Sequence, residues 1–468
     1  MGRHSSFAVV AIWVAVGLVC ESEPAQAVLN LRPSRKAPRQ GKPVRRVLIV
    51  TSSYYPAVLA DTHRARVLAP ELKSLGWEVE ILAAGALFQR ADAIESDAAP
   101  FFDLSIPVHF AGPCGDAVFR VLNMRSIGWR ALFPLYQAGA KLLEQKRFDL
   151  IYITTAQFNL FCLGRVWYTR FCVPYVLDFH DPWVANIRRI VTTKHTVKFR
   201  INAVLATWLE RFAINGASGI VSVSPTYVAR LRDRCPSAQA LRGNRAVVIP
   251  FAASERDLTV MPAQPEGSGA LDIVYVGAGG KIMEKSWRAI LRSLSNFAAH
   301  NPGKLERFRF RLFGTEAFWK EGEPKFLVEI AREYGLAHLI EEQPGRVSYF
   351  RALEIIQSSA GLIILGVDDP AYMPSKLFTY AQTGKPLLAS LHARSQANDY
   401  FNQMPNLGRL IHFDDDEEMT KSGETQIQAF LNDVATQHRI DRFAQIEPWL
   451  SRSSAQKHIE LFERVLST

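Results

Sequence analysis

The chain contains few cysteines and no hydrophobic stretch long enough to cross a membrane. Its five cysteines are scattered over 468 residues, and none belongs to a CxxC pair. This pattern favours buried free thiols in a reducing compartment over a disulfide framework or a cysteine metal site. A marked apolar run, Phe7–Cys20, has 14 residues, whereas a membrane-spanning helix needs ~20.

That apolar run follows a short basic start and precedes Ala25–Ala27, a small-residue sequence typical of a cleavage site. Together these features match a secretory signal, which would export the folded body. A mispredicted start and an uncleaved anchor are the alternatives. We therefore expect residues 1–44 to form a signal-like or anchor segment plus a linker rich in proline and basic residues.

The positive charge is concentrated at the N-terminus. The formal net charge is +10, and eight Lys and Arg residues lie within the first 46 positions, against Glu21 and Glu23. The folded body is therefore only mildly basic. Such an arm suits an anionic membrane surface. No nucleic-acid-binding motif accompanies the charge, so we expect no nucleic-acid partner.

The chain is long for a single core, so two domains are expected. Short apolar segments alternate with helical patterns in both halves, which is typical of α/β folds with parallel sheets. Residues 252–270 lose this periodicity and gain Pro, Gly and Ser, which indicates a domain boundary. We predict two Rossmann-like doubly wound domains, residues 45–252 and 270–440, around a central cleft. The expected strands are Arg46–Thr51, Glu78–Leu82, Asp149–Thr154, Pro174–Phe179, Gly219–Ser224, Val247–Pro250, Leu271–Val276, Phe308–Phe313, Leu362–Leu365 and Leu410–Phe413.

Polar side chains follow two strands of the first half. The loop after Arg46–Thr51 lacks GxGxxG, so a dehydrogenase-type dinucleotide site is not supported. His63 and Arg64 begin the next helix, predicted over Thr62–Leu75, and as donors they suit a phosphate or a sugar hydroxyl. A solvated helix turn is the alternative.

His180 and Asp181 close the strand Pro174–Phe179, at the sheet edge where catalytic groups usually lie. Asp181 would orient His180 or accept a hydrogen bond from a sugar hydroxyl. An N-cap formed by Asp181 before a proline is the alternative. Further on, Asn186–Phe212 mixes basic and apolar residues, which fits either an amphipathic helix on a lipid surface or a charged helix face over an ordinary core.

The second half has two loops suited to an anion. A glycine-rich loop, Gly277–Lys281, lets backbone N–H groups approach a phosphate, and Lys281 or Lys285 would neutralise a diphosphate. The stretch Asp368–Ser390 has a loop, a helix expected to start at Pro374–Lys376 and end at Gly384, and a strand. Its helix start would lie at the carboxyl edge of the sheet, where doubly wound folds bind phosphorylated ligands.

Five segments together resemble the retaining glycosyltransferases of family 4, which have the two-domain GT-B fold: Arg46–Leu82, Val176–Trp183, Glu210–Leu231, Leu271–Lys285 and Pro374–Leu388. Val176–Trp183 (VLDFHDPW) resembles the family's end-of-strand Asp-Pro-Trp segment, and Ile220–Leu231 (IVSVSPTYVARL) its strand–Ser–helix segment. Pro374–Leu388 (PSKLFTYAQTGKPLL) resembles its donor-binding segment PSKxxEYxAxGKPV. The similarity covers about residues 45–465, and its specificity lies in the order and spacing of the motifs.

The resemblance implies sugar transfer from a nucleotide-sugar donor with retention of the anomeric configuration. The second domain would bind the donor and the first the acceptor, with residues 441–468 forming a helix that crosses back to the first domain. No metal or cofactor is implied, because lysines and a helix N-terminus carry the diphosphate charge and the nucleotide sugar is a co-substrate. His180 and Asp181 would face the reacting sugar, and His63 and Arg64 would lie on the acceptor side. The implied donor-binding residues are Lys281, Lys285, Tyr372, Ser375, Lys376 and Thr379.

The sequence departs from the family pattern at Thr379, where the family has a glutamate that holds the donor ribose. A threonine gives one hydrogen bond where a carboxylate accepts two, a loss of ~1–3 kcal/mol. Asp368 or Asp369 would be the substitutes. The family's Gly-Gly is also missing near Ala57–Asp61.

These features favour a glycosyltransferase of the hexosyltransferase type acting on a lipid-linked or polysaccharide acceptor. Because the donor is a cytosolic metabolite, we expect a cytoplasmic location, peripheral to the inner membrane. The alternatives are a GT-B epimerase acting on a UDP-sugar and a catalytically inactive GT-B module in polysaccharide assembly.

Overall fold

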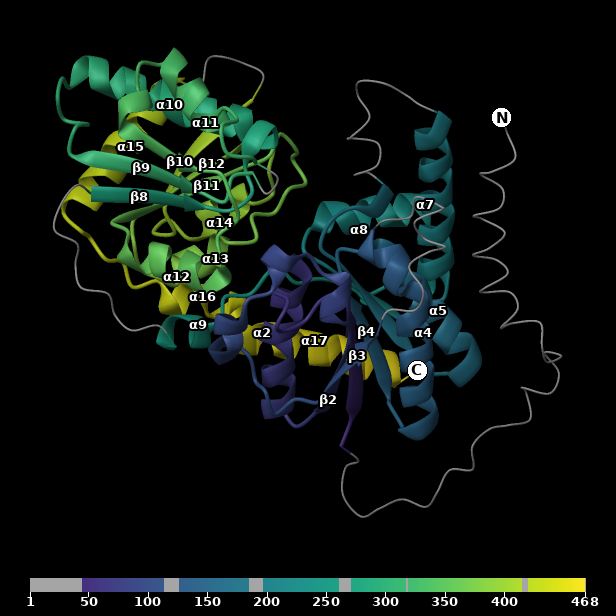
Figure 1. The fold of residues 1–468 in the computed structure, drawn as a ribbon. Helices are drawn as coiled ribbons and strands as arrows, with labels where there is room; N and C mark the ends of the chain where they lie inside the picture. Colours follow the sequence, from purple (N-terminus) through teal and green to yellow (C-terminus); the bar gives the residue numbers. More distant parts are fainter. Residues whose placement is uncertain are drawn as a thin grey trace.

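The structure is a computed structural model that describes residues 44–112, 126–184, 197–260, 271–316, 319–414 and 420–467. The predicted signal-like segment and nearly all of the basic linker lie outside these residues. Two lobes are visible in Figure 1, each built on one sheet. We call residues 44–260 the N-terminal lobe and residues 271–440 the C-terminal lobe.

The N-terminal lobe has a seven-stranded sheet whose order is β3-β2-β1-β4-β5-β6-β7, with every neighbouring pair parallel. In β1, Val47 and Ile49 pack into one core and Leu48 and Val50 into the other, as expected of a central strand covered on both faces. The strands are β1 (Arg46–Thr51), β2 (Glu78–Ala84), β3 (Val108–Ala111), β4 (Leu150–Thr154), β5 (Tyr175–Phe179), β6 (Gly219–Ser222) and β7 (Ala246–Val248).

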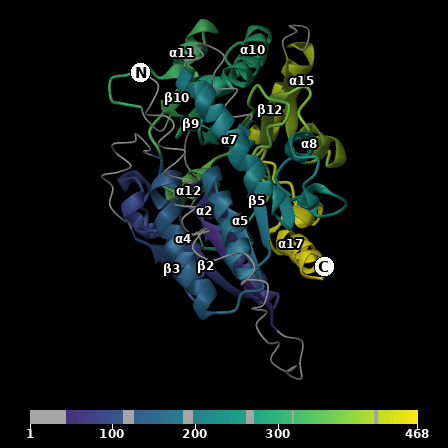
Figure 2. The ribbon, with the colours of Figure 1, turned by 90° about the vertical axis from the view of Figure 1, so that its right-hand side faces the viewer.

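Helices cover both faces of this sheet. One face packs against α4 (Ile127–Gln145), α5 (Cys162–Phe171), α7 (Val197–Asn215) and α8 (Pro225–Arg234), and the other against α2 (Ala60–Ser74). Gly76 ends α2 with a φ of 91°, the left-handed conformation expected of a glycine after a helix. Figure 2 shows α7 on the outside of the lobe.

The C-terminal lobe has a six-stranded parallel sheet with the order β10-β9-β8-β11-β12-β13. Its strands are β8 (Leu271–Val276), β9 (Phe308–Phe313), β10 (Ile340–Gln343), β11 (Gly361–Leu365), β12 (Leu387–His392) and β13 (Arg409–Phe413). On one face lie α10 (Glu284–His300), α11 (Phe326–Glu333) and α15 (Thr420–Ala435), and on the other α12 (Tyr349–Ser358), α13 (Leu377–Ala381) and α14 (Asn398–Gln403).

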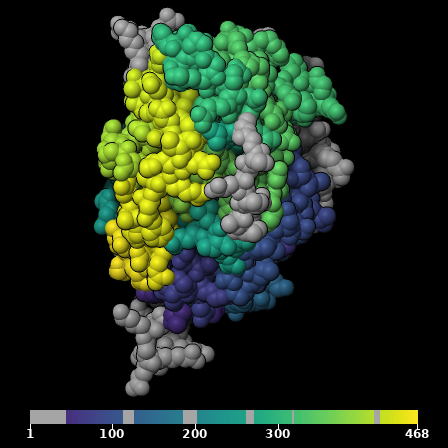
Figure 3. All heavy atoms as spheres, turned by 90° about the vertical axis from the view of Figure 1, so that its left-hand side faces the viewer, coloured from purple at the N-terminus to yellow at the C-terminus, as the bar shows by residue number. Residues whose placement is uncertain are grey.

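Three helices join the lobes. The segment between the sheets includes α9 (Glu255–Thr259), and after the second sheet the chain passes through α16 (Phe443–Ile446) into α17 (Ser451–Leu466). Helix α17 packs against α2 and β6 of the N-terminal lobe. In Figure 3 the yellow C-terminal part of the chain runs along one face, from the green lobe to the purple one. One buried core, formed by residues of both lobes, is therefore continuous across the junction.

The α/β class, the two parallel sheets and the eleven predicted strands, which include the one at the end of Asp368–Ser390, are confirmed, with small shifts at strand ends. The sequence interpretation missed β3 and α4 in the irregular region before residue 149 and β10 in the second half. The helix predicted from Pro374 to Gly384 is wrong in extent, because α13 spans only the five residues Leu377–Ala381. Within the part of the chain that the structure describes, no helix is long and apolar enough to cross a membrane.

Candidate functional site

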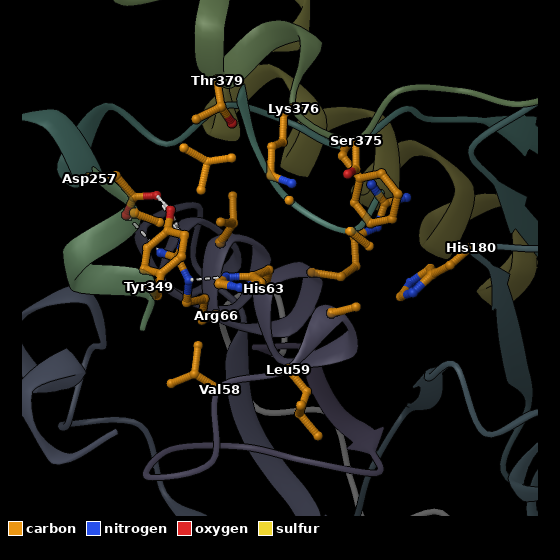
Figure 4. A pocket seen from close by; sticks show the side chains of 18 of the residues that line it. Val58, Leu59, His63, Arg66, His180, Asp257, Tyr349, Ser375, Lys376 and Thr379 are labelled. Atoms are coloured by element: carbon orange, nitrogen blue, oxygen red, sulfur yellow. Dashed lines mark hydrogen bonds and ion pairs between the residues drawn. The ribbon is translucent and has the colours of Figure 1, made fainter. Parts of the chain in front are cut away.

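A cavity of about 490 Å³ lies between the lobes, at the carboxyl ends of strands from both sheets. Helix α2 and the loop after β5 line it from the N-terminal lobe; the loops after β8 and β9, α12 and the segment Tyr372–Tyr380 line it from the C-terminal lobe. Figure 4 shows His63 and His180 on the N-terminal side and Ser375, Lys376 and Thr379 opposite. Eight of the predicted residues line the cavity: His63, Arg64, His180, Asp181, Tyr372, Ser375, Lys376 and Thr379.

Lys376 is the N-cap of α13, and its ammonium lies close to the backbone of the glycine loop. A Cβ atom placed on Gly277 would lie 2.2 Å from the Lys376 Nζ, so the missing side chain makes room for the ammonium. The side chain is half-buried, and burial lowers the pKa of Lys376 to about 8. Because α13 is so short, positive charge here comes mainly from this side chain and little from a helix dipole.

His63 contributes a neutral ring to the same cavity. Burial, together with the neighbouring cations Arg66 and Lys376, holds the pKa of His63 well below its usual range. Its Nδ1 accepts a hydrogen bond from Arg66 Nε at 3.1 Å. A neutral ring that accepts at Nδ1 carries its hydrogen on Nε2, so His63 is suited to donate to a ligand oxygen.

Arg64 is committed to a buried ion pair rather than free to bind a ligand. Its Nε lies 2.9 Å from Asp178 Oδ2, and its Nη atoms donate to the carbonyls of Ile249 and Pro250 at 2.8 Å. Burial would raise the pKa of Asp178, but Arg64 and His180 hold it well below its usual range. The expectation that Arg64 is an available donor is therefore corrected: it is a paired cation that lines the cavity.

Asp178, not Asp181, contacts His180. The Nε2 atom of His180 lies 3.0 Å from Asp178 Oδ2 and 2.9 Å from Thr154 Oγ1. Asp181 lines the cavity, and burial raises the pKa of its carboxyl group. The sequence did not single out Asp178, because it lies inside the strand β5 and residues within a buried strand are expected to be part of the core.

Two predicted donor residues lie outside the cavity lining. Lys281 and Lys285 are exposed, and Lys285 forms an ion pair with Asp368 at 3.0 Å. Neither Asp368 nor Asp369 lines the cavity, so the suggested substitutes for the missing glutamate are not in place. Of the glycine loop, Gly277 and Ala278 line the cavity, whereas the lysines that follow them do not.

A cluster formed by Arg66, Asp257 and Tyr349 also lines the cavity, and the sequence did not predict it. Arg66 donates to both oxygens of Asp257 at 2.7 Å, and Tyr349 contacts both residues, with its hydroxyl 2.5 Å from Asp257 Oδ2 and 2.6 Å from Arg66 Nη2. Arg66 and Asp257 are 3% and 2% exposed. The three residues come from α2, α9 and α12, so the cluster joins the two lobes. Sequence spacing gives no signal for such a contact.

Two Rossmann-like lobes with a ligand-sized cleft between them define the GT-B fold. Residues 62–252 match the family described as "Glycosyl transferase 4-like domain". Together the family match and the fold indicate a glycosyltransferase of the GT-B type.

The similar solved structures include HepE of Anabaena in complex with UDP and glucose, with 15% identity, a TM-score of 0.55 and coverage of 89% of this chain and 99% of that one. The catalytic domain of starch synthase IV from Arabidopsis thaliana, bound to ADP and acarbose, has 14% identity, a TM-score of 0.53 and coverage of 91% and 100%. An E. coli structure named for trehalose-6-phosphate and bound with UDP-2-fluoro glucose has 11% identity, a TM-score of 0.58 and coverage of 89% and 99%. A search of curated protein sequences finds no match.

Proposed function

We propose that this chain transfers a hexose from a nucleotide-sugar donor to a lipid-linked or saccharide acceptor, with retention of configuration. The observation that carries the proposal is the position of Lys376. Its ammonium lies against the backbone of the glycine loop at the cavity wall, and among the described residues it forms no ion pair with a carboxylate. Desolvating a cation without a partner is costly unless an anion joins it. A diphosphate in the cavity would be such an anion, because it would reach both the Lys376 ammonium and the N–H groups of the glycine loop beside it.

The proposed binding mode places the diphosphate beside Gly277 and Lys376, on the cavity side of both, and the sugar toward His180. The nucleoside then lies toward Thr379 and the apolar wall formed by Val347, Leu353 and Ile356. Similar structures with the same fold were solved with UDP, ADP or UDP-2-fluoro glucose. No metal is required in this proposal, because Lys376 supplies the positive charge.

The experiment is a thermal-shift screen of the full chain with UDP-, GDP-, ADP- and TDP-sugars, followed by a transfer assay with lipid and saccharide acceptors. A ligand that binds only the folded state raises the melting temperature. Lys376→Met should abolish the shift, while Lys281→Met, at an exposed lysine outside the cavity, should keep it. The absence of both binding and transfer with every donor would contradict the proposal.

A catalytically inactive module is the second candidate, and Thr379 supports it. Such a module binds nucleotide sugars weakly or not at all and transfers nothing. The epimerase alternative differs in needing no acceptor, because it would interconvert free nucleotide sugars. The transfer assay with and without acceptor separates all three.

We also propose that the protein associates with an anionic membrane surface from the cytoplasmic side. Helix α7 exposes Val204 and Trp208, which are 71% and 44% exposed, beside the exposed Arg211. An apolar and basic helix face of this kind suits a headgroup interface. The basic residues predicted to contribute at 188–195 lie outside the described residues.

A further inference from the structure

The contacts of His180 determine which of its ring nitrogens carries the hydrogen. Two oxygens face Nε2, Asp178 Oδ2 at 3.0 Å and Thr154 Oγ1 at 2.9 Å. An unprotonated Nε2 would place its lone pair against a carboxylate oxygen, which is repulsive. A protonated Nε2 donates toward both oxygens, while the Thr154 hydroxyl donates its own hydrogen to Asp178 at 2.9 Å.

The other neighbours of Asp178 reinforce this arrangement. Tyr152 has one hydroxyl hydrogen and two possible acceptors, Asp178 Oδ2 at 2.7 Å and His458 Nε2 at 3.1 Å. His458 Nδ1 lies 2.7 Å from the Ser454 carbonyl, so it donates there. The shorter distance assigns the tyrosine hydrogen to the carboxylate. The Asp178 carboxylate thus accepts hydrogen bonds from Tyr152, Thr154 and His180. It remains an anion because Arg64 lies beside it as a counter-charge.

The opposite nitrogen of His180 is the unsatisfied one. The His180 side chain is only 4% exposed, so water has little access to it. Its Nδ1 is buried and has no hydrogen-bond partner among the described residues. The residue lines the cavity, and in Figure 4 its ring points into it. A buried acceptor without a donor is uncommon in proteins and calls for an explanation, such as a partner that arrives with a ligand.

We propose that Asp178 is a positioning residue that holds His180 as the Nε2–H tautomer, so that Nδ1 presents a lone pair to the bound sugar. The sugar group at this point is then a hydrogen-bond donor, a hydroxyl, rather than a carboxylate or a phosphate. The part concerning the sugar rests on the proposed function; the tautomer does not. His458 of α17 packs edge-on against the Tyr152 ring, so the C-terminal helix supports the geometry of the site.

The first test is 15N NMR of the full chain labelled at histidine, without ligand, using His180→Gln to assign the signal. We expect Nδ1 unprotonated and Nε2 protonated. A protonated Nδ1 overturns the proposal whatever the protein does.

The second test separates positioning from folding. The readout is the ratio of the dissociation constants of UDP and UDP-glucose, which isolates the contribution of the sugar. Asp178→Asn should reduce this ratio at least fivefold, with UDP affinity unchanged. Glu210→Gln loosens another buried carboxylate, paired with Arg234 away from the cavity, and should leave the ratio unchanged.

An unchanged ratio in Asp178→Asn, or an equal change in Glu210→Gln, overturns the positioning role. If Asp178→Asn does not fold, Thr154→Val removes the other oxygen that faces His180 Nε2, and the same ratio of dissociation constants is measured. If the wild-type protein binds neither UDP nor UDP-glucose, UDP-glucose is excluded as the donor. The NMR measurement of the His180 tautomer then still decides the role of Asp178.

Discussion

Arg346 of the C-terminal lobe donates a hydrogen bond to Glu95 of the N-terminal lobe, with 2.5 Å between Nη2 and Oε1. Glu95 is 4% exposed and also accepts from the backbone N–H of Tyr349 at 2.6 Å. Burial raises the pKa of Glu95 even though Arg346 opposes the shift. The Glu95 carboxylate therefore holds the start of α12 against the N-terminal lobe, at the wall of the cavity.

Replacing Arg346 by alanine should open the cleft, because Glu95 would otherwise remain as an unpaired buried charge. We expect a larger radius of gyration by solution scattering. Arg351→Ala is the matched control, since Arg351 is exposed and its ion pair is with Glu354 of its own helix. Equal scattering of the two variants would contradict a role for this pair in holding the lobes together.

Breaking the Arg66–Asp257 pair should cost far more stability than breaking an exposed pair. Asp257→Asn leaves a buried guanidinium uncompensated, and we expect a loss of about 3–5 kcal/mol. Glu341→Gln breaks the exposed pair with Arg311 and should cost about 1 kcal/mol or less. Chemical denaturation of the two variants measures the difference; similar losses would mean that the cluster is hydrated in solution.

Donor binding should weaken as the pH rises through about 8. The charged form of Lys376 binds the diphosphate, and its pKa in the ligand-free protein is lowered to about 8. Above that pH the free protein must take up a proton to bind, so affinity should fall by up to about tenfold per pH unit. Calorimetric titration of the responsive nucleotide from pH 6.5 to 9.5 measures this. Lys376→Met should bind weakly at every pH, and a wild-type profile that is flat across this range would exclude the mechanism.

Thr379→Glu should strengthen nucleotide binding if the cavity accommodates a ribose at this position. A carboxylate that accepts two ribose hydroxyls adds ~1–3 kcal/mol, which is roughly 5- to 150-fold in affinity. Thr379→Val removes only the hydroxyl and controls for changes in packing. An unchanged or weaker affinity in Thr379→Glu would favour the inactive-module alternative.

Trp208→Ala should reduce binding to anionic vesicles. Phe443→Ala is the control, because Phe443 is 51% exposed but lies on α16 instead of α7. Co-sedimentation with phosphatidylcholine vesicles, with and without phosphatidylglycerol, measures the effect. If both variants bind as the wild type does, α7 is not the membrane-facing element.

The sequence alone determined the fold class and the positions of the central strands along the chain, because buried parallel strands such as β1 and β11 are continuous apolar runs that few other structures accommodate. It also marked His180, Ser375 and Lys376 as residues at strand and helix ends, and these line the cavity. Local chemistry suffices there, since the end of a parallel strand always reaches the same edge of the sheet.

Only the tertiary structure decided which charges are available. Arg64 and Asp178 are 114 positions apart, and Arg66 and Tyr349 are 283 apart; no periodicity connects them. The structure removed Lys281 and Lys285 from the cavity and replaced Asp181 by Asp178 beside His180. Ion pairs and hydrogen bonds depend on distances of a few ångströms between distant segments, and those distances are fixed by the packing of whole lobes rather than by local sequence.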